Sequence, residues 1–335
     1  NLTLATPIWP QSTLSQAEAE DAYQQAQERL ASLTQQLQSL LPLPAVALTP
    51  VAEDSVTYDT NLSRDEFMQV VEEAKESIRA GEIFQIVPSM RFTTEFTAQP
   101  LAFYRALRYL NPSPYMFYLK LNQATIIGAS PEILVRVKEN RIAIRPLAGT
   151  RKRGATEAED IALEQELLND TKEMAEHLML LDLGRNDVGR VAQAGSVQVT
   201  ERMVIERYSH VMHIVSNVEG ELDERYTPMQ ALMAGFPAGT VTGAPKIRAM
   251  QLLDELEPQR RGFYGGCVGY FSTQGEMDSC ITLRTALIKD GKLHLQAGAG
   301  VVADSDPLSE YEEVCNKAKA LMRAAELTPQ FEVPK

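Results

Sequence analysis

The feature that most constrains the fold is a series of short apolar segments that come in adjacent pairs. Segments typical of strands lie at 116–120, 124–128, 133–137, 141–145, 196–200, 203–208, 212–218, 264–273, 279–289 and 292–297. Only a few turn residues separate most pairs, and connections this short join antiparallel strands but not parallel ones. Helical segments lie at about 63–80, 101–110, 159–183, 227–233, 245–255 and 307–326. We therefore expect antiparallel sheets with helices packed outside, not a parallel doubly wound sheet.

The N-terminal part of the chain has a different pattern. Residues 15–42 predict one amphipathic helix, because Ser15 can cap it and leucines recur at helical spacing. Residues 41–55 contain three prolines and are typical of a linker. We predict an N-terminal helix and linker over residues 1–55 and one larger domain over residues 56–330.

Composition excludes several classes of partner. The formal net charge is -13, whereas nucleic-acid binding requires clustered Lys and Arg. No apolar run reaches the roughly 18 residues that a membrane helix needs, and no secretory leader is present. The 3 cysteines are widely spaced and form no CxxC pair, which favours a reduced, cytoplasmic setting.

Two apolar helical segments carry paired carboxylates. Glu173 and Glu176 are three residues apart, as are Glu310 and Glu313, so each pair lies on one face of its helix. Two such pairs could meet around a hard divalent cation such as Mg²⁺, which prefers carboxylate and water oxygens. The alternative is a solvated helix edge with ordinary ion pairs, for example Glu313 with Lys317. The spacing alone favours this alternative.

Two glycine-containing loops are candidate ligand sites. In "FPAGTVTGAPKIRAM", backbone N–H groups before a helix and Lys246 could bind an anion; a plain turn is an equal alternative. In "LHLQAGAGVVADSD", the spacing G-x-G-x-x-A is not followed at once by a helix, so we reject a dinucleotide site. These glycines could instead bring backbone N–H groups close to a carboxylate. His210 and His213 would point to opposite faces of a strand, so they predict no metal pair.

Together, several stretches resemble the chorismate-utilising enzymes, in unbroken order from about residue 63 to 326. They are "GASPEILVRV", "RPLAGTRKRG", "KEMAEHLMLLDLGRND", "YSHVMHIVSNVEGEL", "GTVTGAPKIRAMQLLDELEPQRRGFYGGCVGYF", "CITLRTALI" and "LQAGAGVVADSDPLSEYEEVCNKAKAL". Two further stretches, "FQIVPSMRF" and "NPSPYMFY", make the resemblance greatest to the large subunits of anthranilate synthase.

The resemblance implies a fold and a reaction. The fold is an α+β arrangement of two large antiparallel sheets packed at a steep angle, with helices on the outer faces and the site between the sheets. The reaction adds ammonia to chorismate, then eliminates pyruvate to leave anthranilate, a step of tryptophan biosynthesis. A glutamine amidotransferase subunit would supply the ammonia, and Mg²⁺ would be the cofactor.

The resemblance also implies roles for residues. Glu176 and Glu313 resemble the metal ligands, and Glu173 and Glu310 the adjacent carboxylates that hold metal-bound water. Glu132 resembles the general acid for the leaving hydroxyl, and His213 the residue that assists pyruvate loss. The expected substrate contacts are Tyr264, Arg284, Lys317 and the backbone of Gly298, Ala299 and Gly300. Thr240 and Gln85 complete the expected catalytic set.

Members of the family differ in the nucleophile that they use, and lysines at two positions distinguish them. Aminodeoxychorismate synthases often carry a Lys where this chain has Ala148, and isochorismate and salicylate synthases carry one where it has Gln85. Ammonia needs neither lysine, which favours anthranilate synthase. Two alternatives stay open: an aminodeoxychorismate synthase component I, and a chorismate-binding subunit without catalysis.

One departure concerns regulation. The feedback site for tryptophan in the anthranilate enzymes pairs the "NPSPYM" segment with an upstream "LLES" segment that this sequence lacks. We therefore expect the chain to start within the family's N-terminal region, with residues 1–55 as a remnant of the regulatory part. Half of a tryptophan site would remain, at Asn111, Pro112, Ser113, Tyr115 and Met116.

Overall fold

The chain folds around antiparallel sheets, as the paired segments predict. A computed structural model describes residues 4–8, 15–38, 49–52, 55–208 and 211–332. The chain divides into two units, one of residues 1–47 with 333–335 and one of residues 48–332. The first unit contains helix α1 (Gln16–Gln38), and Ser15 caps it by accepting a hydrogen bond from the Glu18 N–H (3.4 Å). Most of the predicted linker, as well as His210, lies outside the described residues.

One large sheet of the second unit has six strands. Their order is β1 (Asp59–Thr60), β3 (Ser89–Glu95), β15 (Lys292–Gly298), β14 (Thr285–Lys289), β5 (Thr125–Ser130) and β4 (Tyr115–Lys120). Every neighbouring pair is antiparallel. The sheet therefore combines strands from the two ends of the unit with strands from its first half.

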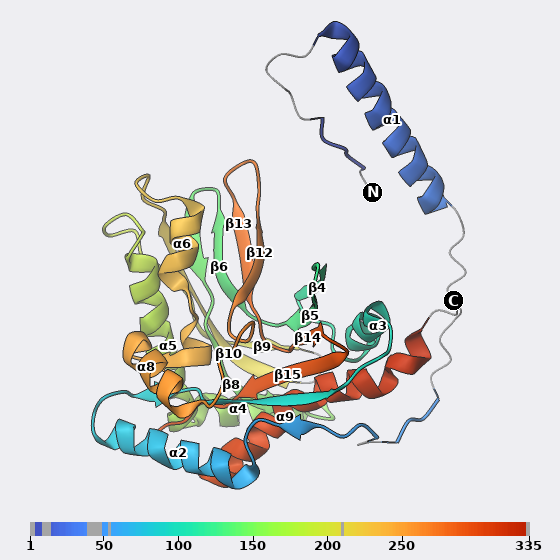
Figure 1. The fold of residues 1–335 in the computed structure, drawn as a ribbon. Helices are drawn as coiled ribbons and strands as arrows, with labels where there is room; N and C mark the ends of the chain where they lie inside the picture. The colour runs from blue at the N-terminus through green and yellow to red at the C-terminus, as the bar shows by residue number, and fades with distance from the viewer. Residues whose placement is uncertain (1–3, 9–14, 39–48, 53–54, 209–210, 333–335) are drawn as a thin grey trace. The chain divides into compact units, whose positions relative to one another are not determined.

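The other large sheet has seven strands. Their order is β12 (Cys267–Phe271), β13 (Met277–Ile281), β6 (Ile133–Lys138), β7 (Arg141–Ile144), β10 (Val211–Glu221) and β8 (Leu147–Lys152), with β9 (Gln198–Arg207) also paired to β10. A small sheet joins β2 (Gln85–Ile86) to β11 (Gly243–Ala244). In Figure 1, β3 and β15 run across the view whereas β6, β12 and β13 run upward, so the two large sheets cross steeply, as expected.

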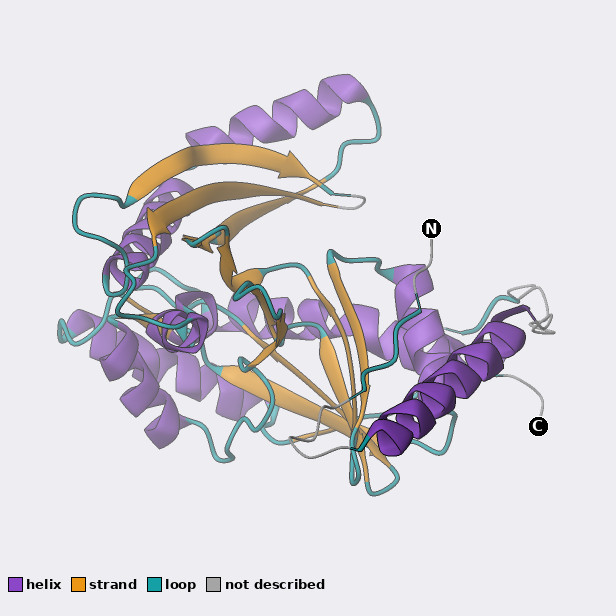
Figure 2. Cartoon of the chain, turned by 90° about the horizontal axis from the view of Figure 1, so that it is seen from above, coloured by secondary structure: helices purple, strands orange, loops and turns teal. Residues whose placement is uncertain are grey.

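Helices cover the outer sides of both sheets (Figure 2). The six-stranded sheet packs against α9 (Pro307–Leu327) and α3 (Pro100–Leu110), and α9 contacts α2 (Arg64–Arg79), which lies below it in Figure 1. The seven-stranded sheet packs against α4 (Glu157–Asn169), α5 (Thr171–Gly189) and α6 (Pro228–Gly235). The remaining helical segments are α7 (Gly239–Thr242), α8 (Lys246–Leu256) and η1 (Thr328–Phe331). No described helix combines the length and apolarity that crossing a membrane requires.

The chain passes between the large sheets at two neighbouring points. Pro131 and Glu132 connect β5 of one sheet to β6 of the other, and residues 282–284 connect β13 to β14 in the opposite direction. The Ile281 N–H donates to the Glu132 carbonyl (3.1 Å), and the Ala129 N–H donates to the Arg284 carbonyl (3.1 Å). The two crossings therefore lie side by side, and each is hydrogen bonded to a strand that adjoins the other.

Several segments differ from the sequence prediction. The predicted helix at 159–183 is two helices, because Asp170 is extended and its carboxylate caps α5 by accepting from the Lys172 N–H (3.0 Å). The predicted strand at 279–289 is β13 and β14, interrupted where Arg284 adopts a positive φ of 46°. The two strands predicted at 196–200 and 203–208 are one irregular strand, β9. Strand β8 was not predicted.

The contact between α2 and α9 offers a test of the packing. Phe67 of α2 is fully buried, and its ring lies 6.2 Å from that of Tyr311 on α9. Phe67→Ala removes these contacts and leaves a cavity, so the free energy of unfolding should fall by about 3–5 kcal/mol in urea denaturation. The matched control is Phe84→Ala, because Phe84 is 70% exposed and should cost little. Equal losses in both variants would contradict the packing described.

Candidate active site

Glu132 lies at the first crossing between the sheets and is buried. Burial raises the pKa of its carboxyl to about 8, although the Thr240 hydroxyl and the charges of Lys317 and Arg284 oppose this shift. Desolvation penalises the charged form, so a carboxyl in this position keeps its proton at neutral pH. Glu132 is therefore suited to donate a proton.

His213 of β10 is also buried, with the opposite consequence. Burial lowers the pKa of its imidazole to about 4, so the ring is neutral at pH 7. Its Nδ1 lies 3.1 Å from the Gly149 carbonyl and 3.0 Å from the Thr150 hydroxyl. Because a carbonyl only accepts, Nδ1 carries the proton and Nε2 keeps a lone pair. His213 is therefore suited to accept a proton at Nε2.

Arg284 and Tyr264 supply donors for an anionic ligand. The Arg284 side chain is partly buried and makes no hydrogen bond or ion pair with the residues that the structure describes. Burial lowers the pKa of its guanidinium, and the charge of Glu132 opposes this. Burial raises the pKa of Tyr264 to about 12, so its hydroxyl remains a donor. A guanidinium that lacks a protein partner is suited to a carboxylate.

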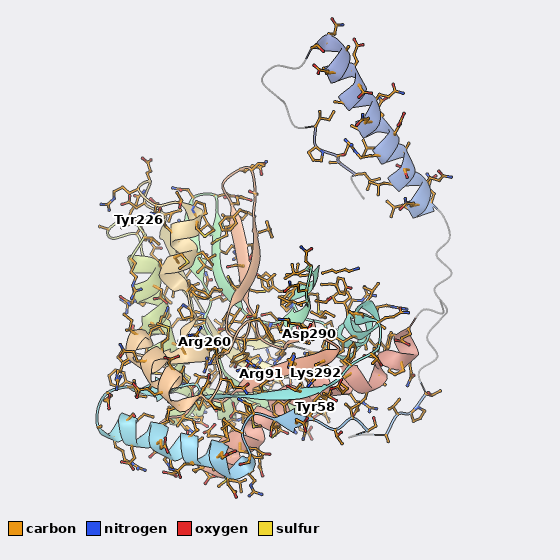
Figure 3. The ribbon with its side chains drawn as sticks, viewed as in Figure 1. Tyr58, Arg91, Tyr226, Arg260, Asp290 and Lys292 are labelled. Atoms are coloured by element: carbon orange, nitrogen blue, oxygen red, sulfur yellow. The ribbon has the colours of Figure 1, made fainter. Side chains whose placement is uncertain are left out.

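The loop that carries Tyr264 is fastened to the six-stranded sheet by arginines. Arg91 of β3 donates to the carbonyls of Arg260 (2.7 Å) and Arg261 (3.1 Å). Figure 3 labels Arg91 and Arg260, which lie close together between the end of α8 and β3. The Arg261 guanidinium lies 5.5 Å from the centre of the Tyr264 ring. These contacts hold the Tyr264 side chain in place.

The glycine loop after β15 lies against the same residues. A side chain at Gly298 would come within 2.9 Å of the Tyr264 hydroxyl, and one at Gly300 within 2.8 Å of Gln85 Nε2. A Cβ at Gly298 would also lie 2.8 Å from the Pro88 carbonyl oxygen, so glycine is required there, whereas at Gly300 the Gln85 side chain would have to move. The Ala299 N–H already donates to the Pro88 carbonyl (3.2 Å), so it is not free for a ligand. Lys317 donates to the Gly298 carbonyl (3.1 Å).

The paired carboxylates approach one another from α5 and α9. Gln85 Nε2 donates to Glu176 Oε1 (2.6 Å), and burial raises the pKa of Glu176, with further contributions from the charges of Glu173 and Glu313. Burial also raises the pKa of Glu310, and the charge of Glu313 adds to this. The charge of Glu313, which is itself exposed, therefore acts on both Glu176 and Glu310, whose carboxyl groups are poorly solvated.

Part of this charge is already neutralised by cationic side chains. Lys317 pairs with Glu313 (2.6 Å), as the helix-edge alternative predicted, and Arg151 pairs with Glu173 (3.4 Å). Among the described residues, no three His, Cys, Asp or Glu side chains are close enough to hold a metal ion. The mutual repulsion at Glu176 and the unpartnered Gln85 Oε1 still fit a hard divalent cation, which would relieve both.

The prediction that Lys246 helps to bind an anion at the loop before α8 is wrong. Lys246 donates to Asp187 Oδ2 (2.7 Å) and to the Gly235 carbonyl (3.0 Å), and both charged side chains are buried. A cation committed to a buried partner is not free for a ligand. Sequence reasoning missed this pair, and it also missed Thr150 as a partner of His213. The stretch "PLAGT" did indicate a functional region, but no spacing rule connects Thr150 with a strand about sixty residues later.

The segment with the proposed half tryptophan site lies between α3 and β4. Asn111 follows α3, the Ser113 hydroxyl donates to the Asn111 carbonyl (3.5 Å), and Met116 lies in β4 beside Tyr115. The Tyr115 hydroxyl donates to Asp278 Oδ1 (2.8 Å) of the other large sheet. Tryptophan binding at this segment stays a prediction.

The chain is similar to known proteins over most of its length. Residues 5–323 match the family model described as chorismate binding enzyme. Anthranilate synthase component 1 of Cereibacter sphaeroides is 55% identical over 97% of this chain, and that of Pseudomonas putida is 53% identical over 93%. The aligned region spans 64% and 63% of these relatives, which is less than two thirds of their length.

Solved structures give a consistent result. The crystal structure of anthranilate synthase component I from Streptococcus pneumoniae has a TM-score of 0.82 and 42% identity, over 92% of this chain and 68% of that one. The menaquinone-specific isochorismate synthase of Escherichia coli has a TM-score of 0.76 and 27% identity, over 91% of this chain and 69% of that one. The predicted fold class is therefore confirmed.

The carboxylates on α5 and α9 lead to a test of metal binding. A ligand that binds only the folded protein stabilises it, so millimolar Mg²⁺ should raise the Tm measured by scanning calorimetry. Glu310→Gln should abolish most of this rise, because it removes one of the buried charges. Glu312→Gln is the matched control, since Glu312 lies on the same helix and is exposed. A Tm rise that both variants retain would exclude Glu310 from the site.

Proposed function

Because the chain belongs to the family of chorismate binding enzymes, we propose that it carries the catalytic centre of an anthranilate synthase large subunit. The proposed reaction converts chorismate and ammonia into anthranilate and pyruvate. The main support for this reaction is an acid and a base whose pKa values are displaced in opposite directions, to about 8 at Glu132 and about 4 at His213. Such pairs are typical of sites where one group gives a proton and the other takes one.

In the first step, ammonia bonds to C2 of chorismate while the C4 hydroxyl leaves. Hydroxide is a poor leaving group, so the proton of Glu132 would go to it and water would depart. The Thr240 hydroxyl, which favours the charged form of this carboxyl, would stabilise the carboxylate that results. The added nitrogen loses a proton, which restores the neutral acid.

In the second step, the ring becomes aromatic as pyruvate departs. His213 Nε2 would take the proton from C2, the bond from C3 to the ether oxygen would break, and the enol that leaves would become pyruvate. The Gly149 carbonyl holds the tautomer that leaves Nε2 unprotonated. Loss of pyruvate requires a base, and an unprotonated Nε2 provides one. The tautomer of His213 therefore supports complete turnover to anthranilate, not release of the amino intermediate.

Chorismate has two carboxylates, and the donors of the site suit them separately. Arg284 and Tyr264 would bind the enolpyruvyl carboxylate, with Lys317 and Gly300 nearby. Glu173, Glu176, Glu310 and Glu313 would hold Mg²⁺, which would supply positive charge to the ring carboxylate. Gln85 and Ala148 stand where related enzymes with other nucleophiles carry lysine, and ammonia requires no such base. Ammonia would come from a glutamine amidotransferase partner, with tryptophan as feedback inhibitor.

The pH dependence of turnover tests the role of Glu132. The acid is active when protonated, so kcat should fall as the pH rises through about 8, the pKa that burial produces. Glu132→Gln should reduce kcat by about 10²–10⁴-fold, as expected for a general acid, and should remove this limb of the profile. The measurement is anthranilate fluorescence with chorismate, Mg²⁺ and high ammonium. An unchanged limb in Glu132→Gln would assign the ionisation to another group.

The role of His213 is tested by separating the two steps. His213→Met removes the base without a new charge, so pyruvate release should slow more than amination and the amino intermediate should accumulate. Chromatography of the products measures both. Equal slowing of both steps would contradict the assignment. With the unchanged chain, 4-amino-4-deoxychorismate as the only amine would indicate an aminodeoxychorismate synthase, and chorismate binding without turnover would indicate a non-catalytic subunit.

A further inference from the structure

A small cavity lies beside Glu132 at the interface of α5, α6, α7 and the seven-stranded sheet. Its volume is about 30 Å³, and Glu132, Thr240, Asp187 and Gly184 are among the residues that line it. A water molecule needs roughly 10–15 Å³ measured in this way, so one or two molecules fit.

Two buried polar atoms of this lining make no well-formed hydrogen bond with the described protein atoms, although the Thr240 hydroxyl is near enough to Glu132 to act on its carboxyl. They are Thr240 Oγ1 and Asp187 Oδ1. Asp187 Oδ2 is fully engaged with Lys246 (2.7 Å), so the second oxygen is the one that remains. Buried polar atoms are almost always satisfied by protein or ordered water, because an unpaired one keeps the full cost of losing its hydration.

We infer that this cavity binds ordered water that links the Asp187 carboxylate to the Thr240 hydroxyl, which makes Asp187 a positioning residue for Glu132. The donors and acceptors match. A water molecule there would donate one hydrogen to Asp187 Oδ1 and one to Thr240 Oγ1, which would turn the Thr240 hydroxyl toward the Glu132 carboxyl. Lys246 holds the other Asp187 oxygen and so fixes the orientation of the carboxylate.

The inference adds to the proposed function, because it rests on Glu132 as the acid and explains how its partner Thr240 is oriented. The charged and titratable groups that act on Glu132 or Asp187, or line the cavity, come from several elements. The charges of Lys317 and Arg284 act on Glu132, and the charge of Glu132 acts on Tyr264 and Tyr208. The charges of Lys246 and Arg190 act on Asp187. Arg145 lines the cavity.

Two substitutions should shift the pKa of Glu132 in opposite directions. Asp187→Asn removes a negative charge and leaves the buried Lys246 uncompensated, which favours the charged form of Glu132 and lowers its pKa. Gly184→Ala places a methyl group 3.6 Å from Ile144 and 3.9 Å from Pro146, which also line the cavity, so it fills space without a clash. Displacing the water dries the surroundings of Glu132 and raises its pKa.

The test is a carboxyl-carbon NMR titration of the full chain labelled at glutamate, without chorismate. Glu132→Gln identifies the Glu132 signal. We expect a pKa shift of at least about half a unit, downward in Asp187→Asn and upward in Gly184→Ala, since both changes alter charge or solvation near the carboxyl. Gly189→Ala is the matched control, because it adds a methyl group to the same helix with nothing within 4 Å.

The inference would be overturned if the pKa of Glu132 in both Asp187→Asn and Gly184→Ala equals that of the wild type. If Asp187→Asn does not fold, Gly184→Ala alone decides, since it changes no charge. A crystal structure that shows no water bonded to both Asp187 and Thr240 would also overturn it. The titration needs neither substrate nor turnover, so it stands even if the anthranilate assay fails, and the two failures are distinguishable.

Discussion

The double crossing of the chain between its two large sheets is the constraint on which the site depends. Glu132 connects β5 to β6 and Arg284 connects β13 to β14, and the two connections lie side by side. A strand that leaves one sheet for another exposes backbone groups, and here the carbonyls of Glu132 and Arg284 accept from Ile281 and Ala129, which lie in the strands beside the other connection. The same geometry places the Glu132 carboxyl and the Arg284 guanidinium in one region, where each affects the pKa of the other.

Burial then gives the titratable groups their different characters. Loss of water disfavours every charged form, so it makes Glu132 a weaker acid and His213 a weaker base. Both groups are consequently neutral near pH 7, one holding a proton and the other ready to take one. Hydrogen bonds decide the remaining detail, because the Gly149 carbonyl selects the tautomer of His213.

The acidic residues of α5 and α9 have protein partners that offset part of their charge. Lys317 pairs with Glu313, Arg151 with Glu173, and Gln85 donates to Glu176. These contacts offset part of the repulsion that burial intensifies. Under the proposed function, a bound Mg²⁺ would compete with Lys317 for Glu313, which leaves the ammonium group available to the substrate.

The sequence by itself determined the antiparallel class of the fold and most helix and strand positions, because periodicity and capping are local properties, and its family resemblance supplied the candidate residues. The helical segment predicted from about residue 63, for example, is α2, and Ser63 caps it. Only the tertiary structure decided that the segment 279–289 divides between two sheets, that Lys246 serves a buried Asp187, and that Thr150 holds His213. These are contacts between residues far apart along the chain, and burial, which sets their energies, depends on the packing of the whole domain.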